Sequence, residues 1–371
     1  MRRLEHYVSA GGKLLRCGYT TGTCAAAAAR AAAELLLAQS HVPAVVVETP
    51  AGIRVTVDVE EAACGAGWAR CAVRKDAGDD ADVTDGVLVC ATVTVAQKAG
   101  VVVDGGLGVG RVTKPGLDQP VGAAAINSVP RAMIAEAVLA AARAYGYDGG
   151  LVVEISIPAG VELAARTFNP KLGIEGGISV LGTTGIVRPM SQDALVAAIA
   201  AELSVLRASG ADHVLVVPGN YGKTFACERL GLNADEAVMC SNYLGDTIDE
   251  AVRLGFCSML VVGHVGKMVK VAGGIMNTHS RVADCRAEVF AAHAAMAGAS
   301  RDVVHAIMEA TTTDAMVDIV SAQGLLEPTM ASLMERLEDV LARRAGSGML
   351  VDAVVFSNKM GVLGVTKNVA C

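Results

Sequence analysis

Aromatic side chains and runs of basic residues are both scarce in this chain of 371 residues. Phe, Tyr and Trp make up 3% of the sequence, although 53% of all residues are hydrophobic. A core built from it must therefore consist of small aliphatic side chains packed between helices and sheets. The formal net charge is −7, and no stretch concentrates Lys and Arg. This balance argues against nucleic acid as a partner, because such binding depends on neutralising phosphates.

Long hydrophobic runs and closely spaced cysteine pairs are absent as well. Arg30 and Glu34 interrupt the alanine-rich stretch from Cys24 to Ala38. No other apolar stretch reaches the roughly 18 to 20 residues that span a membrane, so we expect a helix of a soluble protein there. The ten cysteines form no C-x2-C pair. We therefore expect reduced, mostly buried thiols in a cytoplasmic protein without a metal site.

Common signatures of enzyme chemistry are also missing. The segment VVPGNYGKT is similar to a phosphate-binding P-loop, but Val217 stands where that motif has its first glycine. The fragment GLGVG at 106–110 is not a dinucleotide fingerprint, because no helix follows it. His264, His279 and Asp284 are fifteen and five residues apart, which fits no metal-binding pair on a helix face. No G-x-S-x-G elbow for a nucleophile occurs.

From Gly176 onward, short apolar runs alternate with helical patterns. The expected strands are Ile178–Leu181, His213–Val217, Glu236–Cys240, Ser258–Val262 and Val351–Phe356. The helices expected between the first four are Gln192–Ala208, Lys223–Leu230 and Leu244–Leu254. This alternation predicts a parallel sheet that binds ligands at the carboxyl ends of its strands. Four strands run into glycine-rich or polar loops, LGTTG, VVPGNYGKT, CSNYLGDT and VVGHVGKMVKVAGGIMNTH, which predicts a small-molecule cleft.

The first half of the chain has a different pattern. Its four β-type runs, two of which alternate apolar and polar residues, are Ala44–Glu48, Ile53–Val59, Trp68–Lys75 and Val87–Val95. They predict a mostly antiparallel or mixed sheet. We therefore expect a two-domain α/β protein. Residues 1–160 form an N-terminal α+β domain that binds substrate, and residues 161–371 form a Rossmann-like, three-layer domain with a parallel sheet that binds a cofactor.

Two polar segments of the first half have both a structural and a functional interpretation. Thr20, Thr21 and Thr23 precede a strong helix, where they predict either capping alone or a site for an anion. The aspartate-rich loop 76–85 predicts either a solvated hairpin loop or a polar lid, and its spacing is not that of an EF-hand. Cations also gather in the loops of this acidic protein, which indicates an anionic ligand; they are Arg111, Lys114, Arg188, Lys223, Lys267, Lys270 and Arg281.

Five strings of the sequence, in order and spanning most of its length, resemble the CbiD family of anaerobic cobalamin biosynthesis, the cobalt-precorrin-5B C-1 methyltransferases. They are GYTTGTCAAAA (Gly18–Ala28), KDAGDDADVTDG (Lys75–Gly86), GVGRVTKPGL (Gly108–Leu117), NPKLGIEGGISVLGTTGIVRPMS (Asn169–Ser191) and GHVGKMVKVAGGIMNTHSRVADCR (Gly263–Arg286). The acidic loop departs from the family pattern at Ala81 and Asp85, where proline and histidine are more common.

The resemblance implies transfer of a methyl group from S-adenosylmethionine to ring carbon C-1 of a cobalt corrinoid precursor, giving cobalt-precorrin-6A. Cobalt enters only as part of the substrate. The expected partner is this anionic macrocycle; transient contacts with neighbouring pathway enzymes and a homodimer are compatible with it. Methyl transfer is an in-line displacement, so positioning and exclusion of water can supply most of the catalysis. Two rival functions stay open, a nicotinamide-dependent reductase of a corrinoid intermediate and a non-catalytic corrinoid carrier.

Three groups of residues form the candidate site under this hypothesis. The residues expected to bind the cofactor are Gly182, Thr183, Thr184, Gly185, Gly219, Asn220, Tyr221 and Gly263. Those expected to bind the carboxylates of the substrate are Thr20, Thr21, Thr23, Arg111, Lys114, Lys267 and Asn277. His264 or His279 is expected to orient the ring or face the cobalt, and Asp104 is the candidate base for any proton loss.

Overall fold

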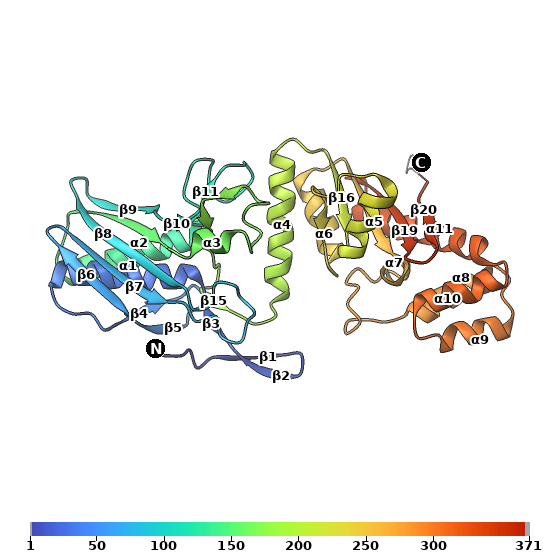
Figure 1. The fold of residues 1–371 in the computed structure, drawn as a ribbon, viewed down its shortest axis with the longest axis horizontal. Helices are drawn as coiled ribbons and strands as arrows, with labels where there is room; N and C mark the ends of the chain where they lie inside the picture. The colour runs from blue at the N-terminus through green and yellow to red at the C-terminus, as the bar shows by residue number, and fades with distance from the viewer. Residues whose placement is uncertain (1, 368–371) are drawn as a thin grey trace. The chain divides into compact units, whose positions relative to one another are not determined.

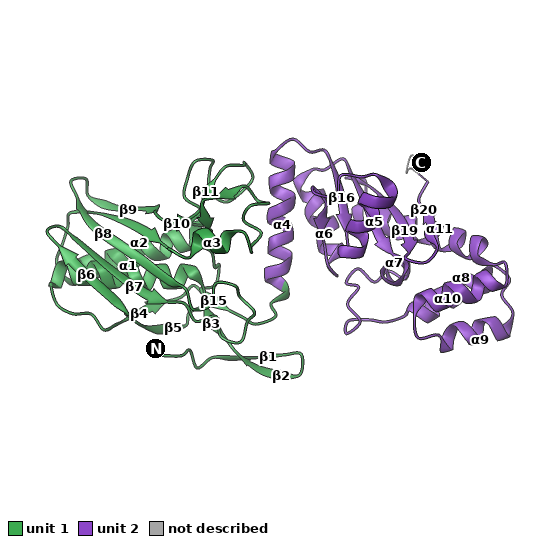
Figure 2. Ribbon diagram, in the orientation of Figure 1, with its two compact units in different colours: residues 1–192 green, residues 193–371 purple. Residues whose placement is uncertain are grey.

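The computed structural model describes residues 2–367, and the chain divides into two compact units, residues 1–192 and residues 193–371 (Figure 2). The sequence placed this division after residue 160. The structure differs because three short strands beyond residue 160 pair with strands of the first half. They are β13 (Ile174–Glu175) with β11 (Arg111–Val112), β14 (Gly177–Ile178) with β10 (Gly108–Val109), and β15 (Ile186–Val187) with β3 (Gly18–Tyr19).

The first unit is built on a five-stranded sheet of mixed orientation. The strands, in their spatial order, are β6 (Glu61–Gly65), β7 (Trp68–Arg74), β8 (Leu88–Ala96), β12 (Gly150–Ser156) and β9 (Gly100–Gly105). Neighbouring strands are antiparallel except β12 and β9, which are parallel. The prediction of a mixed sheet is thereby confirmed. The same unit contains two antiparallel hairpins that form two-stranded sheets of their own. They are β1 (Tyr7–Ala10) with β2 (Lys13–Arg16), and β4 (Ala44–Glu48) with β5 (Arg54–Asp58).

Two helices, α1 (Thr21–Ala38) and α2 (Ser128–Ala144), lie side by side against this sheet (Figure 1). Helix α1 contacts β7 and β8, and α2 contacts β9. The alanines between Ala25 and Ala33 are completely buried, since their small side chains let α1 approach its neighbours closely. A short helix, α3 (Gly160–Ala164), contacts β14. None of the described helices combines the length and apolar character that crossing a membrane requires.

The second unit is built on another five-stranded sheet. Its strands, in spatial order, are β17 (Val238–Met239), β16 (His213–Val217), β18 (Ser258–His264), β19 (Leu350–Ser357) and β20 (Gly361–Val365). The first four are parallel to one another, and β20 runs antiparallel to β19. The sequence predicted the four parallel strands but not β20. It also assigned Ile178–Leu181 to this sheet, which is wrong because β14 pairs with β10 in the first unit.

Apolar cores lie on both faces of the second sheet. On β18, Met259 and Val261 belong to one core, while Leu260 and Val262 pack into the other. The helices around this sheet are α4 (Gln192–Ala208), α5 (Asn220–Leu230), α6 (Leu244–Leu254), α7 (Val265–Ala272), α8 (Arg286–Met296), α9 (Arg301–Glu309), α10 (Thr313–Ala322) and α11 (Leu326–Ala345). Helix α5 supplies Phe225 to the smaller core, and most of the others supply the larger.

Candidate functional site

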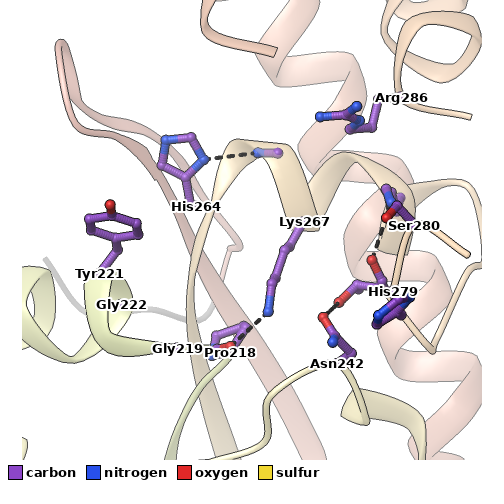
Figure 3. A pocket seen from close by; sticks show the side chains of 13 residues that line it. Pro218, Gly219, Tyr221, Gly222, Asn242, His264, Lys267, His279, Ser280 and Arg286 are labelled. Atoms are coloured by element: carbon purple, nitrogen blue, oxygen red, sulfur yellow. Dashed lines mark hydrogen bonds between the residues drawn. The ribbon is translucent and has the colours of Figure 1, made fainter. Parts of the chain in front are cut away.

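In the sheet of the second unit, the order in which the chain adds strands reverses at β16. The chain goes from β16 to β17 on one side and then returns to β18 on the other side of β16. The loops that leave β16 and β18 therefore diverge, and open α/β sheets bind ligands at such a point. A pocket of about 570 Å³ lies there (Figure 3), lined by Pro218, Gly219, Tyr221, Gly222, Asn242, His264, Gly266, Lys267, Lys270, Thr278, His279, Ser280 and Arg286.

The turn after β16 shapes one wall of this pocket. A side chain at Gly222 would place its Cβ 2.6 Å from a carbonyl oxygen of β18, so glycine allows α5 to approach the sheet. Gly219 has an extended backbone, and a Cβ there would meet no atom within 4 Å. Gly219 and Tyr221, two of the residues predicted to bind the cofactor, line the pocket. Asn220 and Gly263, predicted with them, adjoin lining residues in the chain but do not line it.

Lys267 extends from the first turn of α7 toward the ends of β16 and β17 (Figure 3). Its Nζ donates hydrogen bonds to the carbonyl oxygens of Pro218 (2.8 Å) and Ser241 (2.9 Å). Lys267 is half-buried, and burial lowers its pKa. The nearby Cys240 thiol does not compensate this charge, because burial raises its pKa to about 12. Within residues 2–367, no carboxylate forms an ion pair with Lys267.

Two further cations border the same pocket. Lys270 is 4% exposed, and its Nζ donates to the carbonyl oxygens of Thr278 (3.2 Å) and Ala283 (3.0 Å). Asp284 accepts two hydrogen bonds from Arg286, at 2.7 and 2.8 Å, which lower its pKa, and it lies 3.8 Å from Lys270. None of the thirteen lining residues is Asp or Glu. The pocket therefore presents cations and neutral donors, a lining that favours an anionic group.

His264 ends β18 and caps α7. Its Nδ1 accepts a hydrogen bond from the backbone N–H of Gly266 (3.2 Å), so the proton of the neutral ring is on Nε2. That nitrogen lies 3.5 Å from Oδ2 of Asp314, and the ring stands edge-on to Phe356 with centroids 5.5 Å apart. The acceptor nitrogen of this predicted catalytic residue is thus engaged in a structural bond.

His279, the second predicted histidine, lies in the loop after α7 and lines the pocket. The ring Nδ1 of His279 accepts a hydrogen bond from the backbone N–H of Arg281 (3.1 Å). The backbone N–H of His279 donates to Oδ1 of Asn277 (3.1 Å). Asn277 does not line the pocket. Asn242 does, and it is oriented by the hydroxyl of Thr278, which donates to its Oδ1 (3.1 Å). Local hydrogen bonds thus fix this part of the lining.

The three threonines at the start of α1 form hydrogen bonds within the first unit. The hydroxyl of Thr20 accepts from the backbone N–H of Thr23 (3.2 Å), and the hydroxyl of Thr23 donates to the carbonyl of Gly185 (2.6 Å). The hydroxyl of Thr21 bonds to both backbone groups of Leu181, at 3.2 and 3.1 Å. All three threonines are buried. Helix capping and attachment of the loop, the structural one of the two interpretations, account for these hydroxyls.

The predicted cofactor loop Gly182–Gly185 also lies in the first unit, against the start of α1. The expectation that it follows a strand next to β16 is wrong, because the preceding strand, β14, pairs with β10. Gly182 and Gly185 both have positive φ, and a Cβ at Gly182 would lie 2.3 Å from the hydroxyl of Thr20. Thr183 and Thr184 are exposed. Larger residues at these glycines would disturb the first unit and would not report on donor binding alone.

Asp104, the predicted base, and Arg111 form an ion pair in the first unit. The Arg111 guanidinium donates to both Asp104 oxygens, at 2.8 and 3.1 Å, and to the carbonyl of Gly105 at 2.6 Å. These bonds lower the pKa of Asp104, which makes it a weaker base. Lys114, in contrast, is exposed and has no ion-pair partner among the residues that the structure describes.

The acidic loop 76–85 is folded onto the first unit. Asp76 accepts two hydrogen bonds from Arg16, at 2.6 and 2.7 Å. Burial raises the pKa of Asp76, but Arg16 and the backbone N–H of Gly78 together outweigh this effect and hold that pKa below its ordinary value. Lys75, which is 2% exposed, pairs with Asp82. The loop is therefore a structural element that ion pairs attach to Arg16 and Lys75, unlike the solvated hairpin loop that was one expectation.

Metal-binding residues do not cluster in the described part of the chain. Across residues 2–367, no group of three or more His, Cys, Asp or Glu side chains is arranged to hold a metal ion. The cysteines within this range are all free, and Cys371 lies outside the described residues. The structure thus offers a pocket for an organic ligand and no built site for a resident ion in that range.

Several lining residues escaped the sequence analysis, namely Asn242, Thr278, Ser280 and Arg286. The available signal for Asn242 was its position three residues after the end of β17, in the loop CSNYLGDT. Thr278, Ser280 and Arg286 are spread along the segment after α7, and a sequence does not indicate how such a segment folds back.

Known proteins are similar to this chain over nearly its whole length. The family model CbiD matches residues 8–189, and the model of the CbiD C-terminal domain matches residues 277–367. A cobalt-precorrin-5B C(1)-methyltransferase of Ruminiclostridium cellulolyticum is 47% identical over 355 residues, covering 96% of this chain and 92% of that protein. One of Alkaliphilus metalliredigens is 41% identical over 360 residues, covering 97% and 94%. A crystal structure of a cobalamin biosynthesis protein (CbiD) from Archaeoglobus fulgidus is 30% identical, covers 74% of this chain and 86% of its own, and has a TM-score of 0.40.

Proposed function

The chain belongs to the CbiD family, and on that premise we propose that it is a cobalt-precorrin-5B C(1)-methyltransferase. The observation that carries this proposal is the similarity to relatives of that name, which extends across both compact units. The enzyme adds a methyl group to C-1 of cobalt-precorrin-5B and gives cobalt-precorrin-6A, in the route in which cobalt is inserted early. The cobalt is part of the substrate.

S-adenosylmethionine is the proposed methyl donor, and the pocket of the second unit is its proposed site. Four parallel strands with cores on both faces support a Rossmann-like assignment, in which a nucleoside binds at the point where the strand order reverses. A volume of about 570 Å³ suits a ligand of that size. Gly219 and the exposed ring of Tyr221 would face the donor, with Asn220 and Gly263 behind them.

The reaction needs little from side chains beyond positioning. The electron pair of the macrocycle at C-1 attacks the methyl carbon, the carbon–sulfur bond breaks, and the sulfonium becomes a neutral thioether. Any proton that the macrocycle loses passes to solvent or to a nearby base. Asp104 is poorly suited as that base because Arg111 lowers its pKa, and the acceptor Nδ1 of His279 is already engaged by the backbone N–H of Arg281. Closing the pocket against water would prevent hydrolysis of the donor.

Incubation with methyl-labelled S-adenosylmethionine and cobalt-precorrin-5B tests the proposal. We expect the corrinoid to gain one labelled methyl group while S-adenosylhomocysteine forms in equal amount. Oxidation of NADH without methyl transfer would identify a reductase instead, and binding with unchanged corrinoid mass would identify a carrier. A cytoplasmic location, a homodimer and transient contacts with neighbouring pathway enzymes stay predictions.

A further inference from the structure

The half-buried ammonium of Lys267 carries a charge that nothing in the described protein balances. Its two hydrogen bonds go to carbonyl oxygens, which orient it but bring no negative charge. Two titratable groups lie near this ammonium. Burial keeps the Cys240 thiol neutral, and Lys270 carries a charge of the same sign. Holding a charge away from water without a partner costs free energy, so a bound anion would be favoured at this position.

The surroundings of Lys267 indicate what kind of anion fits. The ammonium is held between the loop after β16 and the loop after β17, and it lines the pocket. The lining contains no carboxylate, so the acid that commonly binds a ribose in dinucleotide sites is missing here. Asn242, three residues after the end of β17, is a neutral polar group of the lining. The pocket therefore selects its ligand by attracting a negative group.

We propose that Lys267 binds a carboxylate of a bound reactant, and that this carboxylate is the one on the methionyl group of the methyl donor. The inference rests on the proposed function and specifies which end of the donor the pocket recognises. Both reactants carry carboxylates, but Lys267 shares its pocket with Gly219 and Tyr221 at the reversal of strand order, where a nucleoside-sized ligand binds. The donor would then be held by its amino-acid end.

Calorimetry with two matched ligands tests the inference on the full chain. S-adenosylhomocysteine carries the carboxylate, and its decarboxylated analogue keeps the adenosine, the sulfur and the amine. We expect Lys267→Met to weaken binding of S-adenosylhomocysteine by about 10- to 100-fold, as for loss of a charged hydrogen bond, and to change binding of the analogue less than twofold. Lys359→Met, which removes an exposed lysine paired with Asp318, is the control and should change neither. Lys267→Gln, a second variant, guards against a folding defect of the first.

The outcomes separate this inference from the proposed function. Equal weakening of both ligands, or no weakening of S-adenosylhomocysteine, would overturn the assignment of Lys267. Failure of the unaltered protein to bind S-adenosylhomocysteine would instead count against the proposed donor. The macrocycle is tested with cobyrinic acid and its heptamethyl ester, which differ only in their carboxylates. If Lys267→Met weakens cobyrinic acid alone and leaves S-adenosylhomocysteine unchanged, the carboxylate belongs to the substrate and the donor assignment is wrong.

Discussion

The start of α1 in the first unit and the pocket in the second unit are both polar, but they differ in how their polar groups are paired. The hydroxyls of Thr21 and Thr23 bond to a neighbouring loop, and Asp76 is held by Arg16. In the pocket, Lys267 has no carboxylate partner among the described residues, whereas Nε2 of His264 lies 3.5 Å from Oδ2 of Asp314. Asp76 in the first unit therefore has its counter-ion within the fold, whereas the ammonium of Lys267 in the second unit lacks one among the described residues.

Replacing Lys75 in the first unit and Lys267 in the second should give the largest difference in stability between the two regions. Lys75→Met leaves the Asp82 carboxylate without its cation, so we expect the free energy of unfolding to fall by about 3 kcal/mol. Lys267→Met loses two hydrogen bonds to carbonyl oxygens but leaves no unpaired charge behind, so the free energy of unfolding should fall by less than in Lys75→Met. Urea unfolding measures both, with fluorescence of the single tryptophan, Trp68 on β7, for the first unit and circular dichroism for the second. Similar destabilisation by both variants would contradict the distinction between the regions.

Replacing one glycine in each region should give the next largest difference in stability. A Cβ at Gly18 would lie 2.2 Å from the backbone oxygen of Asp76, so Gly18→Ala should destabilise the first unit by about 2 to 3 kcal/mol. Gly219→Ala adds a methyl group where no atom lies within 4 Å, so stability should change by less than about 0.5 kcal/mol. The same variant should weaken binding of S-adenosylhomocysteine, since Gly219 lines the pocket. Unfolding midpoints and calorimetry decide, and an unchanged midpoint for Gly18→Ala would refute the close contact.

The smallest expected effect is on the pH dependence of stability. Arg16 and the backbone N–H of Gly78 together overcome the effect of burial and lower the pKa of Asp76 in the folded protein, so the folded state holds its proton less tightly than the unfolded state. This contribution to stability is complete above the unfolded pKa of about 3.9, and it is lost as pH falls through the lower, folded value. Asp76→Asn should therefore lose stability at neutral pH and flatten the acid limb of the Trp68 unfolding curve. A parallel acid limb in both proteins would show that the pair contributes nothing.

Local patterns in the sequence were sufficient for most elements of the second unit. The spacing of apolar residues predicted His213–Val217, Gln192–Ala208 and Leu244–Leu254 with the bounds that the structure has. Periodicity is determined by which face of an element is buried, and this information is present in neighbouring residues. The edge strand β20 was not predicted, because its burial pattern does not alternate clearly.

Local patterns in the sequence did not predict to which of the two units the strand before LGTTG belongs. A short apolar run, a glycine turn and a helix follow one another both in this segment and at β16, so local sequence does not distinguish them. Membership of a sheet is decided by two-residue pairings such as Gly108 with Gly177, which join segments far apart in the chain. The same limit applies to Lys267. Its residue type was predicted as a ligand for carboxylates, but its missing counter-ion becomes visible only when the loops after β16 and β17 are brought together.

The buried alanines of α1 have a consequence for how firmly the first unit holds its shape. Alanine has no side-chain rotamers, so burying Ala25 to Ala29 costs no side-chain conformational entropy on folding. It also means that this part of the core has no alternative rotamers through which α1 could shift against β7 and β8. The loop bonded to the start of α1 is therefore attached to a rigid support. Whatever motion accompanies the reaction must arise in parts of the enzyme with larger and more adaptable side chains.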